Sequence, residues 1–256
     1  MSTGLTLEQY QQLNPRCEVP FEGGSVFYVT PTTQTRWRVD TLFQKEPDTI
    51  AWIASFAPAD ILVDIGANVG MYTVWAAKTR GVRVFAFEPE SQNFALLNRN
   101  LVGNQLSGRV SAYCAALSDR SGWSELHLSA FEMGGSCHSL GEKVDFNHVP
   151  MTPAWSQGCV SVRLDDLIAQ GVVQQPTHIK IDVDGFEPKV IAGAERTIAD
   201  PRLRSLLIEV NQNLADHIEM VKSLETRGFR WDPAQIARAE RKSGPFKGCA
   251  EYVFRR

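Results

Sequence analysis

The segment Asp64-Ile65-Gly66-Ala67-Asn68-Val69-Gly70 forms a glycine-rich turn between an apolar run and a predicted helix. Gly66 and Gly70 carry no Cβ, so the backbone can turn sharply there and come close to a ligand. The turn ends at a helix N-terminus, whose free N–H groups can receive a carboxylate. Asp64, at the end of the apolar run, can accept hydrogen bonds from an amine of the ligand or from the loop itself.

Glu88 ends the next predicted strand, 24 residues after Asp64 (88 − 64). An acid at this place can accept both hydroxyls of a ribose through its two oxygens. The loop reads G-x-N-x-G rather than G-x-G-x-x-G, and a dinucleotide pyrophosphate needs the third glycine for close helix packing. The pattern therefore favours a nucleoside that carries an amino acid. A dinucleotide site and an unoccupied tight turn are the alternatives.

A second group of polar side chains follows two later strands. Asp182 ends the run HIKID, Gly185 permits a turn, and Pro188 starts the next helix, while Glu209 and Asn211 end the neighbouring strand. The residues leave three interpretations open. One acid, with Asp182 the leading candidate, contacts substrate hydroxyls or takes a proton. Alternatively, oxygens of the candidate ligands Asp182, Asp184 and Glu209 bind Mg²⁺. In the third, Asp184 and Glu187 only cap the helix.

His138 is a second candidate base, because imidazole titrates near neutral pH. It lies in a stretch of about 130–157 that is rich in Gly, Ser, His and Pro. A stretch of this length without regular structure is typical of a substrate lid or of a disordered segment. We predict a lid insertion over residues 118–160.

Strand and helix signals alternate from residue 61 onward, which predicts a parallel sheet covered by helices. FRW and CAEYVFR are expected to close that sheet as a final hairpin. Upstream, SVFYVT and TRWRVD alternate apolar with polar residues around Pro31 and predict another hairpin. Glu46-Pro47-Asp48 opens a short helical pattern. The predicted buried strands are ILVDI, VRVFAFE, RVSAYCA, HIKIDV and SLLIEV.

Composition narrows the class of protein. The chain has 256 residues with a formal net charge of −3, and its 26 basic residues are scattered among 29 acidic ones. No basic stripe is present, so nucleic acid is not expected as a partner. The five cysteines are widely spaced and lack C-x-x-C pairs, which indicates reduced thiols and a cytoplasmic protein. No apolar run approaches the roughly 18 residues that a transmembrane helix requires.

Taken in order, the segments resemble the FkbM family of methyltransferases. The resemblance implies a class I methyltransferase fold and transfer of a methyl group from S-adenosylmethionine, usually to a hydroxyl of a sugar or polyketide-like metabolite. One position departs from the family, which most often has I-D-V-E-G-x-E where this chain has the shorter Asp184 in I-D-V-D-G-F-E. The matching pieces are KEPDTIAWI (45–53), VDIGANVGMYT (63–73), VFAFEPE (84–90), Ala116-Leu117-Ser118-Asp119, VRLDDL (162–167), IKIDVDGFEPKVIAGA (179–194) and LLIEV (206–210).

The resulting expectation is an S-adenosylmethionine-dependent O-methyltransferase acting on a hydroxylated small molecule or glycan precursor. Its fold is α/β and Rossmann-like, with a mainly parallel seven-stranded sheet and helices on both faces. Residues 1–57 form an N-terminal hairpin and helix cover, and 58–256 form the methyltransferase domain. The catalytic candidates are Asp182, Asp184, Glu187 and His138. By the resemblance, the cofactor residues are Asp64, Gly66, Asn68, Gly70 and Glu88, with Ser118 in the matching turn.

Two rival functions belong to other classes. A nicotinamide-dependent reductase would need a Tyr/Lys pair, but neither Tyr113 nor Tyr252 is followed by lysine at Y-x-x-x-K spacing. A non-catalytic module would bind S-adenosylmethionine only as a ligand. The sequence does not determine the methyl acceptor, a metal requirement or the oligomeric state.

Overall fold

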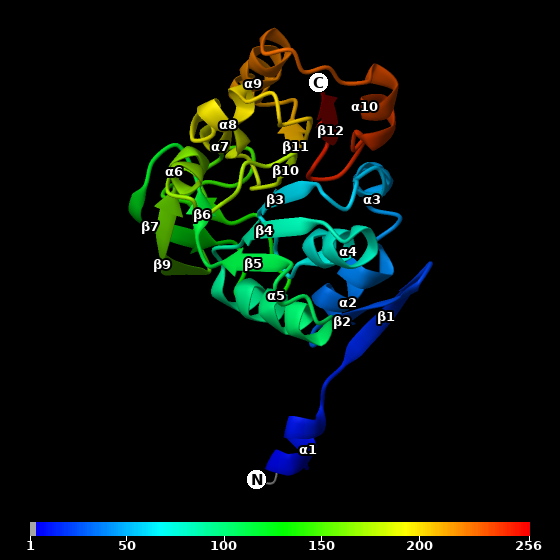
Figure 1. Cartoon of the computed structure of the whole chain (residues 1–256). Coiled ribbons are helices and arrows are strands. Elements are labelled where there is room, and N and C mark those ends of the chain that lie inside the picture. The colour runs from blue at the N-terminus through cyan, green and yellow to red at the C-terminus, as the bar shows by residue number, and fades with distance from the viewer. Residues whose placement is uncertain (1–3) are drawn as a thin grey trace.

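The computed structural model of the chain describes residues 4–256 and is built around one mostly parallel β-sheet (Figure 1). The strand order is β12-β11-β10-β3-β4-β5. All neighbouring strands are parallel except β12, which runs antiparallel to β11. The strands are β3 (Ile61–Ile65), β4 (Arg83–Phe87), β5 (Val110–Tyr113), β10 (His178–Ile181), β11 (Ser205–Asn211) and β12 (Cys249–Arg255).

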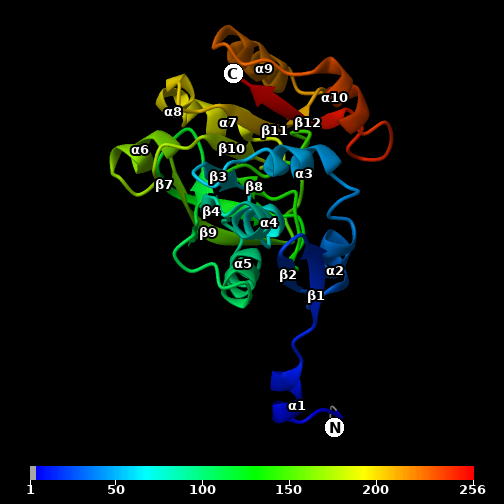
Figure 2. The same ribbon diagram turned by 45° about the vertical axis from the view of Figure 1, so that its right-hand side comes forward.

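Both faces of this sheet are covered, so its strands are apolar on both sides. Leu62 and Val84 belong to the hydrophobic core on one face, and their neighbours Val63 and Phe85 belong to the core on the other. Figures 1 and 2 show the helices in two layers around the strands. The predicted Rossmann-like α/β fold is confirmed. One layer holds α3 (Pro47–Ala54), α4 (Met71–Arg80) and α5 (Ser91–Gly103), and the other holds α6 (Leu164–Ala169), α7 (Glu187–Ala192), α8 (Glu195–Ala199), α9 (Ala215–Thr226) and α10 (Pro233–Ala239).

The predicted seventh strand is wrong. Residues 229–231 form only an isolated antiparallel bridge between Arg230 and Arg255. Helix α9 ends at Thr226, and α10 begins at Pro233 with Asp232 as its N-cap. The pairing does not extend beyond this single bridge, so the central sheet has six strands among the described residues.

The N-terminal region also differs from the predicted hairpin. TRWRVD lies in helix α2 (Thr33–Asp40), where the Thr32 hydroxyl accepts from the Thr35 N–H and the Thr35 side chain accepts from the Thr32 N–H. This capping box starts a helix and outweighs the apolar alternation. The hairpin instead joins β1 (Arg16–Phe21) to β2 (Gly24–Val29). The short helix predicted at Glu46-Pro47-Asp48 is confirmed as α3, and α1 (Leu7–Gln12) stands away from the body (Figure 2).

The interval between the central strands β5 and β10 folds into a small second sheet with the order β6-β9-β7-β8. Residues 129–154 are irregular apart from the two residues of β8. The strands are β6 (Ala116–Leu117), β7 (Gly122–Leu128), β8 (Ser139–Leu140) and β9 (Trp155–Val162). Within residues 4–256, none of the helices has the length and apolar character needed to cross a bilayer.

Candidate active site

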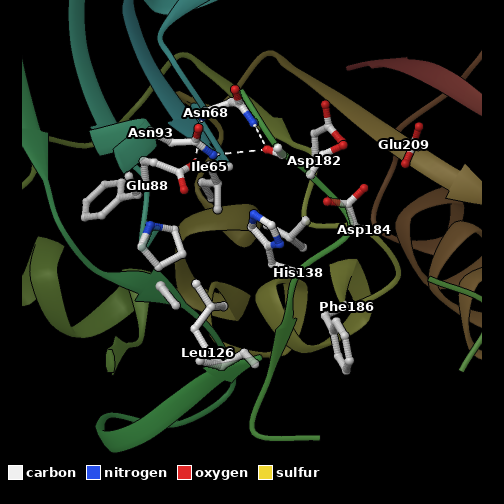
Figure 3. A pocket seen from close by; sticks show the side chains of 18 of the residues that line it. Ile65, Asn68, Glu88, Asn93, Leu126, His138, Asp182, Asp184, Phe186 and Glu209 are labelled. Atoms are coloured by element: carbon white, nitrogen blue, oxygen red, sulfur yellow. Dashed lines mark hydrogen bonds between the residues drawn. The ribbon is translucent and has the colours of Figure 1, made fainter. Parts of the chain in front are cut away.

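A cavity of about 580 Å³ opens at the carboxyl ends of the central strands (Figure 3). The glycine loop after β3 and Glu88 after β4 line one part of it, and the turn after β10 and Glu209 on β11 line another. Figure 3 shows Glu88 and Ile65 on one side of His138, with Asp184 and Glu209 on the other. Ligands of open α/β sheets bind at this edge, where the connections after the strands leave a crevice.

The glycine loop packs directly against the turn after β10. Gly66 has φ 78°, and a Cβ there would overlap the carbonyl oxygen of Asp182. Gly66 and Asn68, two of the predicted cofactor residues, line the cavity. Gly70 has φ 85° and forms the N-cap of α4. It lies outside the cavity lining, and a Cβ on Gly70 would overlap Leu97. Gly70 therefore shapes the loop rather than the cavity surface.

Glu88 is buried at the cavity wall with its carboxylate fixed in orientation. Its Oε2 accepts the Asn68 N–H at 2.7 Å and its Oε1 accepts the Glu90 N–H at 2.8 Å. Burial raises the pKa of Glu88 to about 7, although these two N–H groups favour the charged form. A carboxylate held in this way can accept further hydrogen bonds from a diol without reorganising.

Asp64 lies beneath the glycine loop rather than on the main cavity. Its Oδ2 accepts a hydrogen bond from the Thr73 hydroxyl, while its Oδ1 is buried without a partner among the described residues. Asp64 lines a smaller pocket of about 40 Å³ that shares Gly66, Asn68 and Asp182 with the main cavity.

Asp182, Asp184 and Glu209 converge, with one oxygen from each lying within 4.8 Å of the others. Asp182 accepts a hydrogen bond from Lys180 Nζ at 2.8 Å. Burial alone would raise the pKa of Asp182, but the positive charges of Lys180 and Lys45 outweigh burial and lower this pKa to about 2. Glu209 pairs with Arg241 at 2.5 Å, yet burial and then the charge on Asp182 raise the pKa of Glu209 to about 8. Asp184 Oδ2 accepts the Cys137 N–H at 2.7 Å.

These carboxylates are a poor match for a resident Mg²⁺ ion. Lys180 and Arg241 already place two positive charges against Asp182 and Glu209, and both would repel a divalent cation. A Mg²⁺ site needs oxygens that are free to complete an octahedron. The donor set therefore favours direct contact between the acids and a substrate over the metal interpretation.

Glu187, another catalytic candidate from the sequence, contacts the backbone of the turn after β10. It is fully buried and lies outside the residues that line the cavity. Its Oε1 accepts the Val183 N–H at 2.8 Å, its Oε2 accepts the Gly185 N–H at 3.1 Å, and His217 lies 3.4 Å away. Glu187 thus holds the turn that carries Asp182 and Asp184.

His138 lines the cavity near its middle (Figure 3). Its Nδ1 accepts the Ser129 N–H at 3.3 Å, so the neutral ring carries its proton on Nε2. Nε2 is buried and has no hydrogen-bond partner in the described part of the chain. This tautomer makes His138 a hydrogen-bond donor toward a ligand rather than a base. Ser118 also lines the cavity, and its hydroxyl lies 3.1 Å from Asp119 Oδ1.

Residues 64–231 match the family described as the methyltransferase FkbM domain. The chain belongs to the FkbM methyltransferase family. It is therefore a methyltransferase enzyme, as the sequence predicted.

Two relatives of this FkbM methyltransferase carry names that specify what they act on. The chain is 33% identical over 194 residues to 31-O-demethyl-FK506 methyltransferase FkbM from Streptomyces tacrolimicus, covering 67% of this chain and 73% of the relative. It is 26% identical over 222 residues to hexuronic acid methyltransferase AglP from Haloferax volcanii, covering 85% of this chain and 83% of that relative. A solved precorrin-6y C5,15-methyltransferase from Geobacter metallireducens is similar with a TM-score of 0.47 and 12% identity, covering 90% of this chain and 93% of that one.

Several site residues of this FkbM methyltransferase had no signal in the sequence. Asn93 on α5 donates to the Gly135 carbonyl at 3.1 Å and accepts the Gly134 N–H at 2.7 Å, which holds that segment against the cavity. Arg241, in the loop before β12, reaches Glu209.

Proposed function

We propose that this enzyme is an S-adenosylmethionine-dependent O-methyltransferase that acts on a polyhydroxylated small molecule. The observation that carries the proposal is one continuous cavity, with Glu88 and the glycine loop at one end and Asp182, Asp184 and Glu209 at the other. The first group suits a nucleoside, and the second suits hydroxyl groups. The methyl donor supplies a sulfonium-bound methyl group that an oxygen nucleophile can displace.

Each group of cavity residues has a defined task in this proposal. Glu88 accepts the two ribose hydroxyls, and the backbone of Gly66 and Asn68 lies along the nucleoside tail. The apolar wall at Ala116, Leu117 and Leu126, together with Ser118, surrounds the base. Holding donor and acceptor together in this way supplies the orientation that a displacement reaction requires.

The proton of the acceptor hydroxyl goes to Glu209 in this proposal. Asp182 is a weak base, because its ion pair with Lys180 keeps its pKa at about 2. Glu209 has a pKa of about 8 and so releases and takes protons close to neutral pH, as general-base catalysis requires. Asp182 and Asp184 then orient neighbouring hydroxyls of the acceptor.

The acceptor end of the cavity combines these acids with Phe186 and Phe246. Carboxylates that bind hydroxyls beside apolar rings suit a sugar ring or a hydroxylated cyclic metabolite. The names of the two relatives, one acting on a hexuronic acid and one on a demethylated FK506, support this range. Segment 130–138 is proposed as the lid. A cytoplasmic location and the lack of a nucleic-acid partner stay predictions.

Mass spectrometry of reaction mixtures tests the proposal. The enzyme is incubated with S-adenosylmethionine and a panel of sugars, uronic acids and cyclic alcohols, with either EDTA or Mg²⁺. We expect one added methyl group on at least one acceptor, with equal turnover in EDTA. Turnover should rise with pH through about 8, as Glu209 loses its proton.

Two glutamate-to-glutamine variants, one inside the cavity and one outside it, test the role of Glu209. Glu209→Gln should lower turnover by about 100-fold or more, since a positioned base contributes that much. Glu219→Gln changes an exposed glutamate of α9 outside the cavity and should keep wild-type turnover. Full activity of Glu209→Gln would reject its role as base. Donor binding without methylation of any acceptor in the panel would reject the proposed acceptor class.

A further inference from the structure

A small pocket of about 40 Å³ extends the cavity beneath the glycine loop. It lies between the N-terminal cover and the core, because Lys45 and Glu46 line it together with Asp64 and Lys180. Its volume is close to the share of one or two water molecules, so it can hold the end of a chain but not a nucleoside. Lys45, Gly66 and Asn68 line both the pocket and the large cavity, which makes the two spaces continuous.

Two acids in this pocket each present one unused oxygen. The Glu46 side chain is 2% exposed, and its Oε1 pairs with Lys45 at 2.5 Å while its Oε2 has no partner in the described chain. Asp64 is 1% exposed, with Oδ2 bound to Thr73 and Oδ1 likewise open. A buried carboxylate oxygen without a donor is costly, so a ligand that supplies N–H or O–H groups to both atoms would stabilise this pocket.

The pocket wall carries both signs of charge, because Arg38, Lys45 and Lys180 line it beside Asp182 and the two acids with a free oxygen. Burial opposes ionisation of Glu46, but Lys45 and Lys180 hold its pKa below the ordinary value. Burial raises the pKa of Asp64, Lys180 and the Thr73 hydroxyl oppose that increase, and the charges on Asp182 and Glu46 add to it. A positive group between Glu46 and Asp64 would attract both carboxylates, and its N–H groups would satisfy the free oxygens. An ammonium provides both the charge and three N–H donors.

We infer that Glu46, together with Asp64, binds the α-ammonium group of the methyl donor's amino-acid tail. This inference rests on the proposed function, since it names the residues that bind the amino-acid tail of the same methyl donor. Glu46 lies upstream of residues 64–231, which match the family model, in the segment KEPDTIAWI that also resembles the family. The N-terminal cover therefore contributes a cofactor residue, and the core region alone does not complete the donor site.

Isothermal titration with two ligands isolates the tail contact. S-Adenosylhomocysteine has the amino-acid tail, whereas 5′-methylthioadenosine has the same nucleoside without it. Glu46→Gln keeps the size of the side chain but removes its charge. This substitution should lower the affinity for S-adenosylhomocysteine about tenfold or more, in line with the loss of one charge-assisted hydrogen bond. Binding of 5′-methylthioadenosine should not change, which also shows that the variant is folded.

Glu251→Gln is the matched control. Glu251 is a buried glutamate of the same charge network, paired with Arg241, but it does not line the small pocket. Its S-adenosylhomocysteine affinity should equal that of the wild type. As a second measurement, deaminated S-adenosylhomocysteine should bind the wild type about tenfold more weakly than S-adenosylhomocysteine, and Glu46→Gln should not distinguish the two.

The outcomes separate this inference from the proposed function. Equal weakening of both ligands by Glu46→Gln, or weakening of neither, would overturn the role of Glu46 while the donor assignment stands. If the wild type binds deaminated S-adenosylhomocysteine as tightly as S-adenosylhomocysteine, the role of Glu46 is overturned as well. This measurement does not depend on whether Glu46→Gln folds. A wild type that binds neither S-adenosylhomocysteine nor 5′-methylthioadenosine would reject the proposed function and this inference together.

Discussion

At the scale of single residues, burial changes the acid–base behaviour of Glu88. Because its pKa is raised to about 7, the carboxyl is protonated below that pH and charged above it. The charged form accepts hydrogen bonds from ribose more strongly. We therefore predict that S-adenosylhomocysteine affinity, measured by titration calorimetry, falls as the pH is lowered from 8 to 6, by up to about tenfold.

Glu88→Gln is the control for this pH dependence, because it removes the titrating carboxyl and keeps the size of the side chain. The variant should bind more weakly at pH 8, and the part of the pH dependence that comes from Glu88 should disappear. The same pH profile in the wild type and the variant would show that Glu88 does not contact the ligand in its charged form.

A further prediction at the residue scale concerns the contribution of Lys180 to stability. It is 2% exposed, and it neutralises Asp182 and Asp64 from a central strand. Lys180→Met would remove a cation from the buried Asp64 and would leave the half-buried Asp182 with Lys45, which should lower the free energy of unfolding by about 3 kcal/mol. Urea denaturation measures this change. Lys180→Met/Asp182→Asn should recover part of the loss, and wild-type stability of the single variant would contradict the assigned ion pair.

At the scale of elements, the turn after β10 shows what a sequence pattern can and cannot specify. Strand ends and the helix-starting Pro188 predict that Asp182, Asp184 and Glu187 gather in one turn. The pattern does not specify the direction of each side chain. Glu187 points back to accept the Val183 and Gly185 N–H groups, so it supports the turn instead of facing the cavity.

Residues 134–138 belong to segment 130–138, which is proposed as the lid. Arg38 and Asn68 donate to the carbonyls of Gly134 and Gly135, and Asn93 bonds to both residues. We predict that Asn93→Ala speeds amide hydrogen exchange in this segment, and that S-adenosylhomocysteine slows exchange there in the wild type.

Asn98→Ala is the comparison for this experiment. Asn98 lies on the same helix, and its side chain donates to the Phe94 carbonyl at 2.8 Å, so its replacement should leave exchange in segment 134–138 unchanged. If Asn93→Ala also leaves that exchange unchanged, Asn93 does not hold the segment. If ligand does not alter exchange in the wild type, the segment is not a lid.

At the scale of the whole molecule, the features predicted from sequence are those set by local patterns. The glycine loop, the buried strands and the alternation of strands with helices each depend on neighbouring residues, and together they predict a parallel sheet. The meeting of Glu46, Asp64 and Lys180 depends on how the N-terminal cover packs on the core. Arg241 reaches Glu209 only because the loop before β12 returns to the cavity. Such long-range contacts have no periodic signal.

The whole-molecule account depends on the identity of the ligand at Glu88. Titration calorimetry with S-adenosylhomocysteine and NADH on wild type and Glu88→Ala tests it most directly. The account predicts that the wild type binds S-adenosylhomocysteine but not NADH, and that Glu88→Ala weakens this binding about tenfold or more. Binding of NADH without S-adenosylhomocysteine, or unchanged affinity in Glu88→Ala, would contradict it.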